Sequence, residues 1–168
     1  MQTLALINLQ NITKNEDGYE IKIADRIKTS KINKPQPNLI IPFFKEDITI
    51  CPASAMETYI ELTKEIRGKE NKLLIAIKKP HKAVGTQTLS KWIKITLIDS
   101  GIDTKMFSAY STQHASTSAA KRNIVTIDSI LKTAGWTQKS KTFAKFYDRP
   151  IVGNKTMFAC AVLNKTSQ

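Results

Sequence analysis

The sequence predicts an α+β protein that is mainly helical and has a small antiparallel sheet near its N-terminus. Three observations lead to this prediction. Apolar and polar residues alternate over residues 19–24, which is the two-residue period of a half-buried strand. A proline-containing turn at residues 34–37 then separates this segment from a second apolar stretch. From residue 52 onward, apolar residues recur at helical spacing between capping residues and glycines.

The predicted sheet is a hairpin. A turn containing Asp-Gly at residues 15–18 precedes the first strand, Tyr19–Ala24. The second strand is expected at Asn38–Phe44, where Pro42 indicates a sheet edge or the end of the strand, because proline cannot donate a ladder hydrogen bond. The connection between the two strands carries three lysines.

Two helices are expected in the middle of the chain. The first is Pro52–Ile66, with proline in its first turn and Arg67-Gly68 at its end. Its apolar stripe consists of Met56, Tyr59, Ile60, Leu62 and Ile66. The apolar run Leu73–Ile77 is either a third strand or a buried connector. Either Thr86 or Thr88 caps the second helix, whose Leu89, Trp92, Ile93 and Leu97 are expected in the core and which stops at Ser100-Gly101.

Three further helices are predicted after residue 110. Ser111 or Thr112 caps the first of them, which runs to about Arg122. Thr126 opens the next, and Gly135 ends it. Its inward residues are expected to be Ile127, Ile130 and Leu131. The last helix starts at Ser140, presents Phe143, Phe146 and Tyr147, and ends at residues 148–150.

The composition favours a polyanionic partner. Lysine and arginine number 26 against 14 acidic residues, a formal net charge of +12. Such an excess is most often associated with nucleic acid, less often with an anionic membrane, and is also found on lysine-rich surfaces with no such partner.

Other kinds of chemistry find little support in the sequence. Cys51 and Cys160 form neither a disulfide framework nor a zinc knuckle. His81 and His114 have no Cys or acidic neighbours at metal-ligand spacing, so no metal site is predicted. No apolar run approaches the length that spans a membrane, and no cofactor motif is present.

Four segments, taken in order, resemble the catalytic domain of tyrosine recombinases, and most of all the DIRS and Crypton mobile-element type. Residues 4–12 resemble the sequence after that family's first catalytic arginine. Residues 27–31 (IKTSK) are similar to its hairpin loop with the catalytic lysine. Residues 108–119 (SAYSTQHASTSA) resemble its His-x-x-Arg box. Residues 134–136 (AGW) and 143–147 (FAKFY) resemble its His/Trp and nucleophile segments.

The resemblance implies a role for each matching residue. Tyr147 takes the position of the nucleophile, which attacks a phosphodiester and forms a 3′-phosphotyrosyl bond without a cofactor. Trp136 takes the His/Trp position, where an indole N–H donates to the phosphate. Lys28 takes the position of the general acid, with Lys31 as the substitute if the register is shifted. As an alternative, Tyr147 is a structural tyrosine packed with its neighbouring phenylalanines.

The sequence departs from the family at its two arginines. In the His-x-x-Arg box the histidine position falls on Tyr110 and the arginine position on Gln113, which supplies neither the charge nor the fork of a guanidinium. Arg122 is nine residues further along, about 13 Å at helical rise, and is a poor replacement. The resemblance implies that the other arginine lies upstream of Met1. The chain also starts inside an apolar pattern, so it is expected to be a fragment. Catalysis is therefore expected to be impaired.

The resemblance also sets the expected organisation and partners. Residues 1–150 are predicted to be an N-terminally truncated catalytic domain, and residues 151–168 a tail that packs on a neighbouring subunit. Double-stranded DNA is the expected partner, bound by a homotetramer. The residues expected to contact DNA are Lys28, Lys31, His114, Arg122, Lys139 and Lys141. A nuclear location is expected for a eukaryotic mobile element, and a cytoplasmic one otherwise.

Two other functions are compatible with the same residues. One is a catalytically inactive, mobile-element-derived DNA-binding module, which Gln113 favours. The other is an unrelated basic helical protein that binds RNA or an acidic protein. The recombinase hypothesis differs from the latter in requiring Lys28, Trp136 and Tyr147 to converge on one phosphate.

Overall fold

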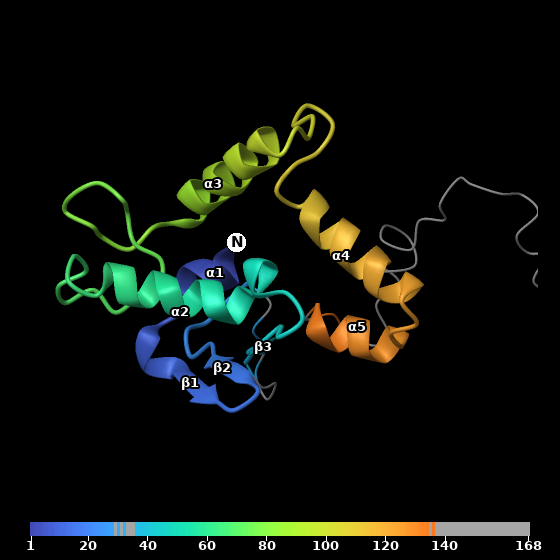
Figure 1. The fold of residues 1–168 in the computed structure, drawn as a ribbon, viewed down its shortest axis with the longest axis horizontal. Coiled ribbons are helices and arrows are strands. Elements are labelled where there is room, and N and C mark those ends of the chain that lie inside the picture. The colour runs from blue at the N-terminus through green and yellow to red at the C-terminus, as the bar shows by residue number, and fades with distance from the viewer. Residues whose placement is uncertain (29, 31, 33–35, 135, 137–168) are drawn as a thin grey trace, which may run out of the picture. The chain divides into compact units, whose positions relative to one another are not determined.

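The computed structural model describes residues 1–28, 30, 32, 36–134 and 136 (Figure 1). The chain divides into two compact units, residues 1–109 and 110–168. The described residues form an α+β structure, as predicted. The elements of the first unit are α1 (Gln2–Leu6), η1 (Leu9–Asn11), β1 (Ile12–Asn15), β2 (Gly18–Lys22), β3 (Asn38–Pro42), η2 (Ile48–Ile50), α2 (Pro52–Thr63) and α3 (Thr86–Asp99). Those of the second unit are α4 (Ser111–Arg122) and α5 (Ile127–Thr133).

The sheet is antiparallel in the order β1-β2-β3. The predicted strand around residues 19–24 is confirmed, and β3 ends at Pro42 on a sheet edge, as expected. The sequence did not reveal β1, because only its first residue is apolar and the other three are exposed. Gly18 turns β1 into β2 at φ +150°, and a Cβ there would lie 2.2 Å from the carbonyl oxygen of Ile41 on β3. The close pairing of β2 with β3 therefore requires glycine at this position.

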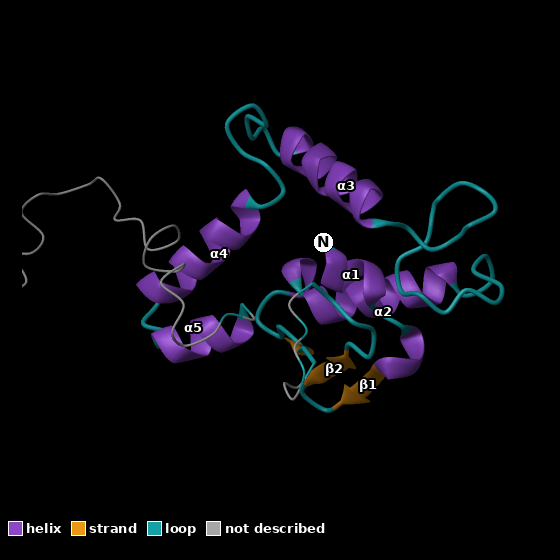
Figure 2. Ribbon diagram, turned by 180° about the vertical axis from the view of Figure 1, so that it is seen from behind, coloured by secondary structure: helices purple, strands orange, loops and turns teal. Residues whose placement is uncertain are grey.

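The core of the first unit lies between the sheet and helices α1 and α2 (Figures 1 and 2). Its buried members are Ile7, Tyr19, Ile21, Ile23, Cys51, Ala53, Met56 and Leu73. The alternation that predicted β2 thus selects its inward side chains correctly. On α2, Pro52 occupies the first turn, but the helix ends at Thr63 rather than at Ile66. Leu62 and Ile66 are 75% and 46% exposed, so the predicted apolar stripe was too long.

The run Leu73–Ile77 is a buried connector rather than a strand. Leu73 and Ile75 are buried, while Ile77 is exposed, and the segment takes part only in isolated bridges. The backbone N–H of Ile75 donates to the hydroxyl of Tyr59 at 3.0 Å, which joins the connector to α2. On the other side, Leu73 N donates to the carbonyl of Ile7 at 2.8 Å.

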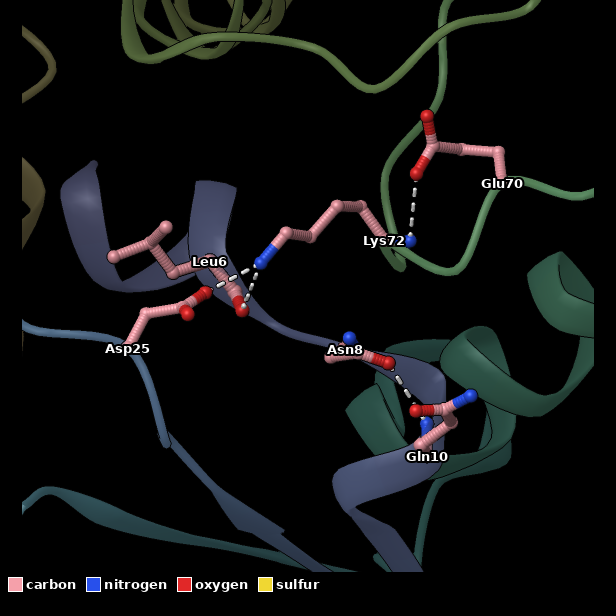
Figure 3. A network of polar contacts seen from close by, with 6 residues as sticks. All are labelled: Leu6, Asn8, Gln10, Asp25, Glu70 and Lys72. Atoms are coloured by element: carbon pink, nitrogen blue, oxygen red, sulfur yellow. Dashed lines mark hydrogen bonds and ion pairs between the residues drawn. The ribbon is translucent and has the colours of Figure 1, made fainter.

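Polar contacts fix the same connector to the N-terminal segment (Figure 3). The ammonium of Lys72 lies 2.5 Å from a carboxylate oxygen of Asp25 and 3.3 Å from the carbonyl oxygen of Leu6. The Glu70 carboxylate accepts hydrogen bonds from the backbone N–H groups of Lys72 and Ala83, which lower the pKa of Glu70. These contacts connect residues that are far apart in the sequence.

Helix α3 differs from its prediction at the N-terminus. Gly85, not Thr86 or Thr88, occupies the cap position, and its carbonyl accepts the N–H of Leu89 at 3.1 Å. The predicted cap was wrong because glycine is itself an accepted cap and both threonines are already helical. Leu89 is buried, whereas Trp92, Ile93 and Leu97 are only half-buried. The predicted stop is confirmed, because Gly101 follows the helix at φ +74°.

In the second unit, α4 and α5 contact each other. Thr126 caps α5 as predicted, since its hydroxyl accepts the N–H of Ser129. Ile130 and Leu131 are buried as expected, but Ile127 is 50% exposed, so its inward assignment was wrong. The cap predicted for α4 was also wrong, because the backbone is already helical at Tyr110. The predicted stop at Gly135 and the helix from Ser140 lie outside the described residues.

Ile124 carries backbone strain where α4 ends. The N–H of Val125 donates to the carbonyl of Ala120, and that of Ile124 to the carbonyl of Lys121, which together form a Schellman motif. The residue at its left-handed position is usually glycine, but here it is Ile124 at φ +64°. The Ile124 side chain is 92% exposed, so it gains almost no burial in return.

Replacing Ile124 with glycine is therefore expected to stabilise the second unit by about 1 kcal/mol, since a β-branched residue in the left-handed region costs roughly that much. Urea unfolding in a Trp92→Phe background measures this, because fluorescence then reports Trp136 in the same unit. Ile124→Val retains the strain and is the control, with little change expected. A glycine variant less stable than the parent would contradict the strain.

Candidate functional site

Lys28 lies on the connection between β2 and β3, the position expected for the hairpin lysine. Its side chain is exposed, and its backbone N–H donates to Oε1 of Gln2 at 2.9 Å. Ser30 holds the adjoining turn: its hydroxyl accepts the N–H of Ile27 at 2.9 Å and donates to Gln36 Oε1 at 2.8 Å. The backbone at Lys28 is thus fixed, while its ammonium reaches solvent. Lys31 lies outside the described residues.

Tyr110 and Gln113 lie at the start of α4. The N–H of Gln113 donates to the carbonyl of Tyr110 at 3.1 Å, and its own carbonyl accepts the hydroxyl of Thr117 at 2.7 Å. Tyr110 is 67% exposed, and Gln113 is half-buried. A groove of about 520 Å³ runs between α4 and α5, with Gln113 at its border. The other lining residues are Ser116, Thr117, Ala120, Val125, Ser129, Ile130, Thr133 and Ala134.

The two basic candidates on α4, His114 and Arg122, lie toward opposite ends of the helix. His114, half-buried, follows Gln113 directly, and its backbone carbonyl accepts the hydroxyl of Thr117 at 3.3 Å. Arg122 is the last residue of the helix and is exposed. Nine residues of helix rise about 13 Å. The guanidinium of Arg122 therefore cannot directly contact a phosphate that is bound at Gln113.

Trp136 packs against the small core of the second unit, formed by Ile130 and Leu131 with Ala120. Its backbone N–H donates to the backbone carbonyl of Leu131 at 2.8 Å. One side of the residue borders a hollow of about 310 Å³ that is also lined by Asp128, Ser129 and Lys132. Trp136 therefore has both an apolar packing role and an accessible side.

The structure distributes the predicted site residues over both units. Tyr110, Gln113 and Trp136 belong to the second unit, and Lys28 belongs to the first. The nucleophile candidate Tyr147 and the DNA-contact candidates Lys139 and Lys141 lie outside the described residues. The convergence of Lys28, Trp136 and Tyr147 on one phosphate stays a prediction.

Arg67 is a buried cation that the sequence did not reveal. It is 9% exposed, and its guanidinium donates to the carbonyls of Lys72 at 2.9 Å and Leu73 at 3.4 Å, and to the hydroxyl of Thr63. Its Nε has no hydrogen-bond partner among the described residues. Arg67 was expected only to close a helix. Its position between the end of α2 and the connector depends on contacts four to six residues away, which no apolar periodicity predicts.

Cys51 is a second unexpected group. It is buried at the N-cap of α2, where its sulfur accepts hydrogen bonds from the hydroxyl and N–H of Ser54 and from the N–H of Phe44, at 3.2 to 3.4 Å. These bonds, the Ser54 hydroxyl first, lower the pKa of the Cys51 thiol to about 7. They favour the thiolate because donors that point at the sulfur stabilise its negative charge.

The depressed pKa predicts a pH-dependent stability. Between the folded value of about 7 and the ordinary value of 9.0, the thiol is ionised when folded but protonated when unfolded, so stability rises with pH across this window. Ser54→Ala is expected to flatten that rise, because it removes the largest cause. Urea midpoints of both proteins across the window measure the effect, with Ser90→Ala as a matched control. An unchanged pH slope in Ser54→Ala would contradict the assignment.

Other kinds of site find no support in the described part of the chain. It contains no group of three or more His, Cys, Asp or Glu side chains able to hold a metal ion. None of its helices combines the length and the apolar character needed to cross a bilayer. No protein-family model matches the chain, and no curated protein matches its sequence.

Proposed function

We propose that this chain binds double-stranded DNA and carries a tyrosine-recombinase type of strand-exchange site. The observation that carries the proposal is the placement of Lys28. Its ammonium is exposed on the β2–β3 connection of a three-stranded antiparallel sheet, and its backbone is fixed by Gln2. That is where a general acid for DNA cleavage is needed in this type of site, on a loop that a sheet holds in position.

In the proposed reaction the hydroxyl oxygen of Tyr147 bonds to the phosphorus and its proton passes to water, from which Lys28 is afterwards reprotonated. The bond from phosphorus to the 5′-oxygen breaks, and Lys28 supplies the proton to that leaving oxygen. Trp136 donates a hydrogen bond to a non-bridging oxygen. The reverse attack by a 5′-hydroxyl rejoins the strand, so the bond energy is conserved and no cofactor is required.

Charge supports DNA as the substrate. Phosphoryl transfer spreads negative charge over the non-bridging oxygens, and fixed cations stabilise it. The chain has a net charge of +12. The proposed contacts to the DNA backbone are Lys28, Lys31, His114, Arg122, Lys139 and Lys141. We propose that the active assembly is a homotetramer on DNA, with residues 151–168 packing on the neighbouring copy.

Gln113 favours a second candidate function, a DNA-binding module without catalysis. Its amide stands in the first turn of α4 where the resemblance requires a guanidinium, and it carries no charge. Among the described residues of α4, the arginine at residue 122 is too far along the helix to replace it. In this reading the basic surface is retained and the cleavage chemistry is lost.

A nicked suicide substrate distinguishes the two functions. The substrate is a pool of labelled duplexes with a randomised central sequence and a nick beside that sequence. When the strand is cleaved near the nick, the short piece that carries the 5′-hydroxyl dissociates. The phosphotyrosyl bond then cannot be reversed. A labelled protein band that resists denaturation, and that Tyr147→Phe abolishes, supports the strand-exchange function. Salt-sensitive binding to the duplex without that band supports the module. Failure to bind duplex DNA at low salt would overturn both.

A further inference from the structure

The longest segment with only basic charge lies between α2 and α3 and continues through α3. Residues 71–98 contain six lysines and one histidine but no aspartate or glutamate. One of the lysines, Lys72, pairs with Asp25. Three others, Lys78, Lys79 and Lys82, lie within residues 76–83, which we call the basic loop, and all three are exposed. None of the three forms an ion pair with another described residue.

The base of the basic loop is held by several hydrogen bonds. Ala76 N donates to the carbonyl of Lys82 at 2.8 Å, and Ala83 N donates to the Glu70 carboxylate at 3.1 Å. His81 closes the loop from within, because its Nδ1 lies 3.0 Å from the carbonyl oxygen of Ala76. Just outside it, Val84 N donates to the carbonyl of Leu74 at 3.1 Å.

Burial strengthens this anchorage. Ile75 and Val84, on the two sides of the base, are 2% and 6% exposed. The loop itself extends away from the helices before and after it, as the green segment leading into α3 in Figure 1 shows. The three ammonium groups are therefore presented on a loop whose base is fixed before binding. This lowers the conformational entropy cost of ordering the loop when it binds.

We infer that the basic loop is a second contact to the DNA backbone, separate from the proposed site of cleavage. The inference rests on the proposed function. Successive phosphates of a DNA strand offer an array of negative charges, which three exposed lysines that form no ion pair with another described residue can neutralise. An anionic membrane fits less well, because Ile77, 81% exposed, is the single large apolar side chain among residues 76–83 and membrane anchoring needs a broader apolar face.

The test measures duplex affinity as a function of salt for the wild-type chain and for Lys78→Gln/Lys79→Gln/Lys82→Gln. If all three contact phosphates, the slope of log affinity against log salt falls by about 2.7, and affinity near 0.1 M salt falls by roughly two orders of magnitude. Circular dichroism checks that the variant is folded.

A second triple variant controls for net charge. Lys22→Gln/Lys45→Gln/Lys64→Gln removes the same charge from lysines elsewhere in the unit. Lys22 and Lys64 lie 3.9 Å from Glu20 and Glu61, and Lys45 is followed by Glu46 in the sequence. This variant is expected to leave the slope close to that of the wild type.

Each other outcome overturns the inference. If the wild type binds DNA and the basic-loop variant keeps its slope, or loses no more than the control, the loop is not a contact while the proposed function stands. If the basic-loop variant loses binding only to phosphatidylserine vesicles, the loop recognises membrane instead. If the wild type does not bind duplex DNA, the proposed function fails with it.

Discussion

Replacing Gln113 with arginine is expected to raise the rate of covalent DNA cleavage by roughly 10³-fold or more, because one arginine aimed at a transferring phosphoryl group contributes about 10³–10⁵ in other enzymes. Gln113 is in the first turn of α4, half-buried at the border of the groove with α5. A guanidinium there supplies the charge and the two parallel N–H donors that the amide lacks.

The measurement is the rate of adduct formation on the nicked duplex pool. Gln113→Lys is the matched variant, since it restores the charge without the fork, and it is expected to gain much less than arginine. Gln113→Met controls for size and should gain nothing. If Gln113→Arg binds DNA as tightly as the wild type but forms no more adduct, Gln113 does not occupy the arginine position of the site.

Replacing Arg67 with alanine is expected to destabilise the first unit by about 3 kcal/mol, since each buried group left without its hydrogen-bond partner costs about 1–3 kcal/mol. The guanidinium satisfies the carbonyls of Lys72, just before the connector, and of Leu73, its first residue. Without it, both oxygens are left in a buried site, and the connector keeps its hydrogen bond to Tyr59 and the packing of Leu73 in the core.

Urea unfolding followed by circular dichroism measures this loss. Arg26→Ala removes an exposed arginine of the same unit and is expected to change stability by less than about 0.5 kcal/mol. Arg67→Lys keeps the charge but not the fork, and an intermediate loss is expected. If Arg67→Ala lowers the free energy of unfolding no more than Arg26→Ala does, the hydrogen bonds of the buried guanidinium do not stabilise the fold.

Most of the helices and the central strand follow from the sequence because their signals are local. The alternation of Tyr19, Ile21 and Ile23 gives both the existence of β2 and its buried face. Pro52 and Thr126 mark the starts of α2 and α5 through the backbone chemistry of their own first turns. These elements are determined by residues a few positions apart, so a pattern can identify them.

The features that the sequence did not reveal depend on distant partners. The β1 strand has one apolar residue in four and exists because β2 pairs with it, Ile12 opposite Ile21. Ile127 has helical spacing, yet it is exposed because α5 turns only Ile130 and Leu131 inward. Arg67 is buried by carbonyls of a later segment. Such contacts are set by tertiary packing, on which propensity and periodicity carry no information.

The candidate site shows the same division. The sequence predicted that Lys28 lies on the connection between the strands at residues 19–24 and 38–44 and that Gln113 is near the start of a helix, and the structure has both residues in these elements. The basic loop was not assigned a role, because its lysines match no motif. What distinguishes it is the bracing by Glu70 and His81, which is visible only in three dimensions.

The attachment point of DNA tests the central claim most directly. The Gln113→Arg protein is allowed to react with the nicked duplex pool, the DNA is digested with nuclease, and the residual nucleotide is located by mass spectrometry of the peptides. The proposed function predicts a nucleotide joined through its 3′-phosphate to the oxygen of Tyr147. A nucleotide on any other residue, or none although the duplex is bound, would contradict it.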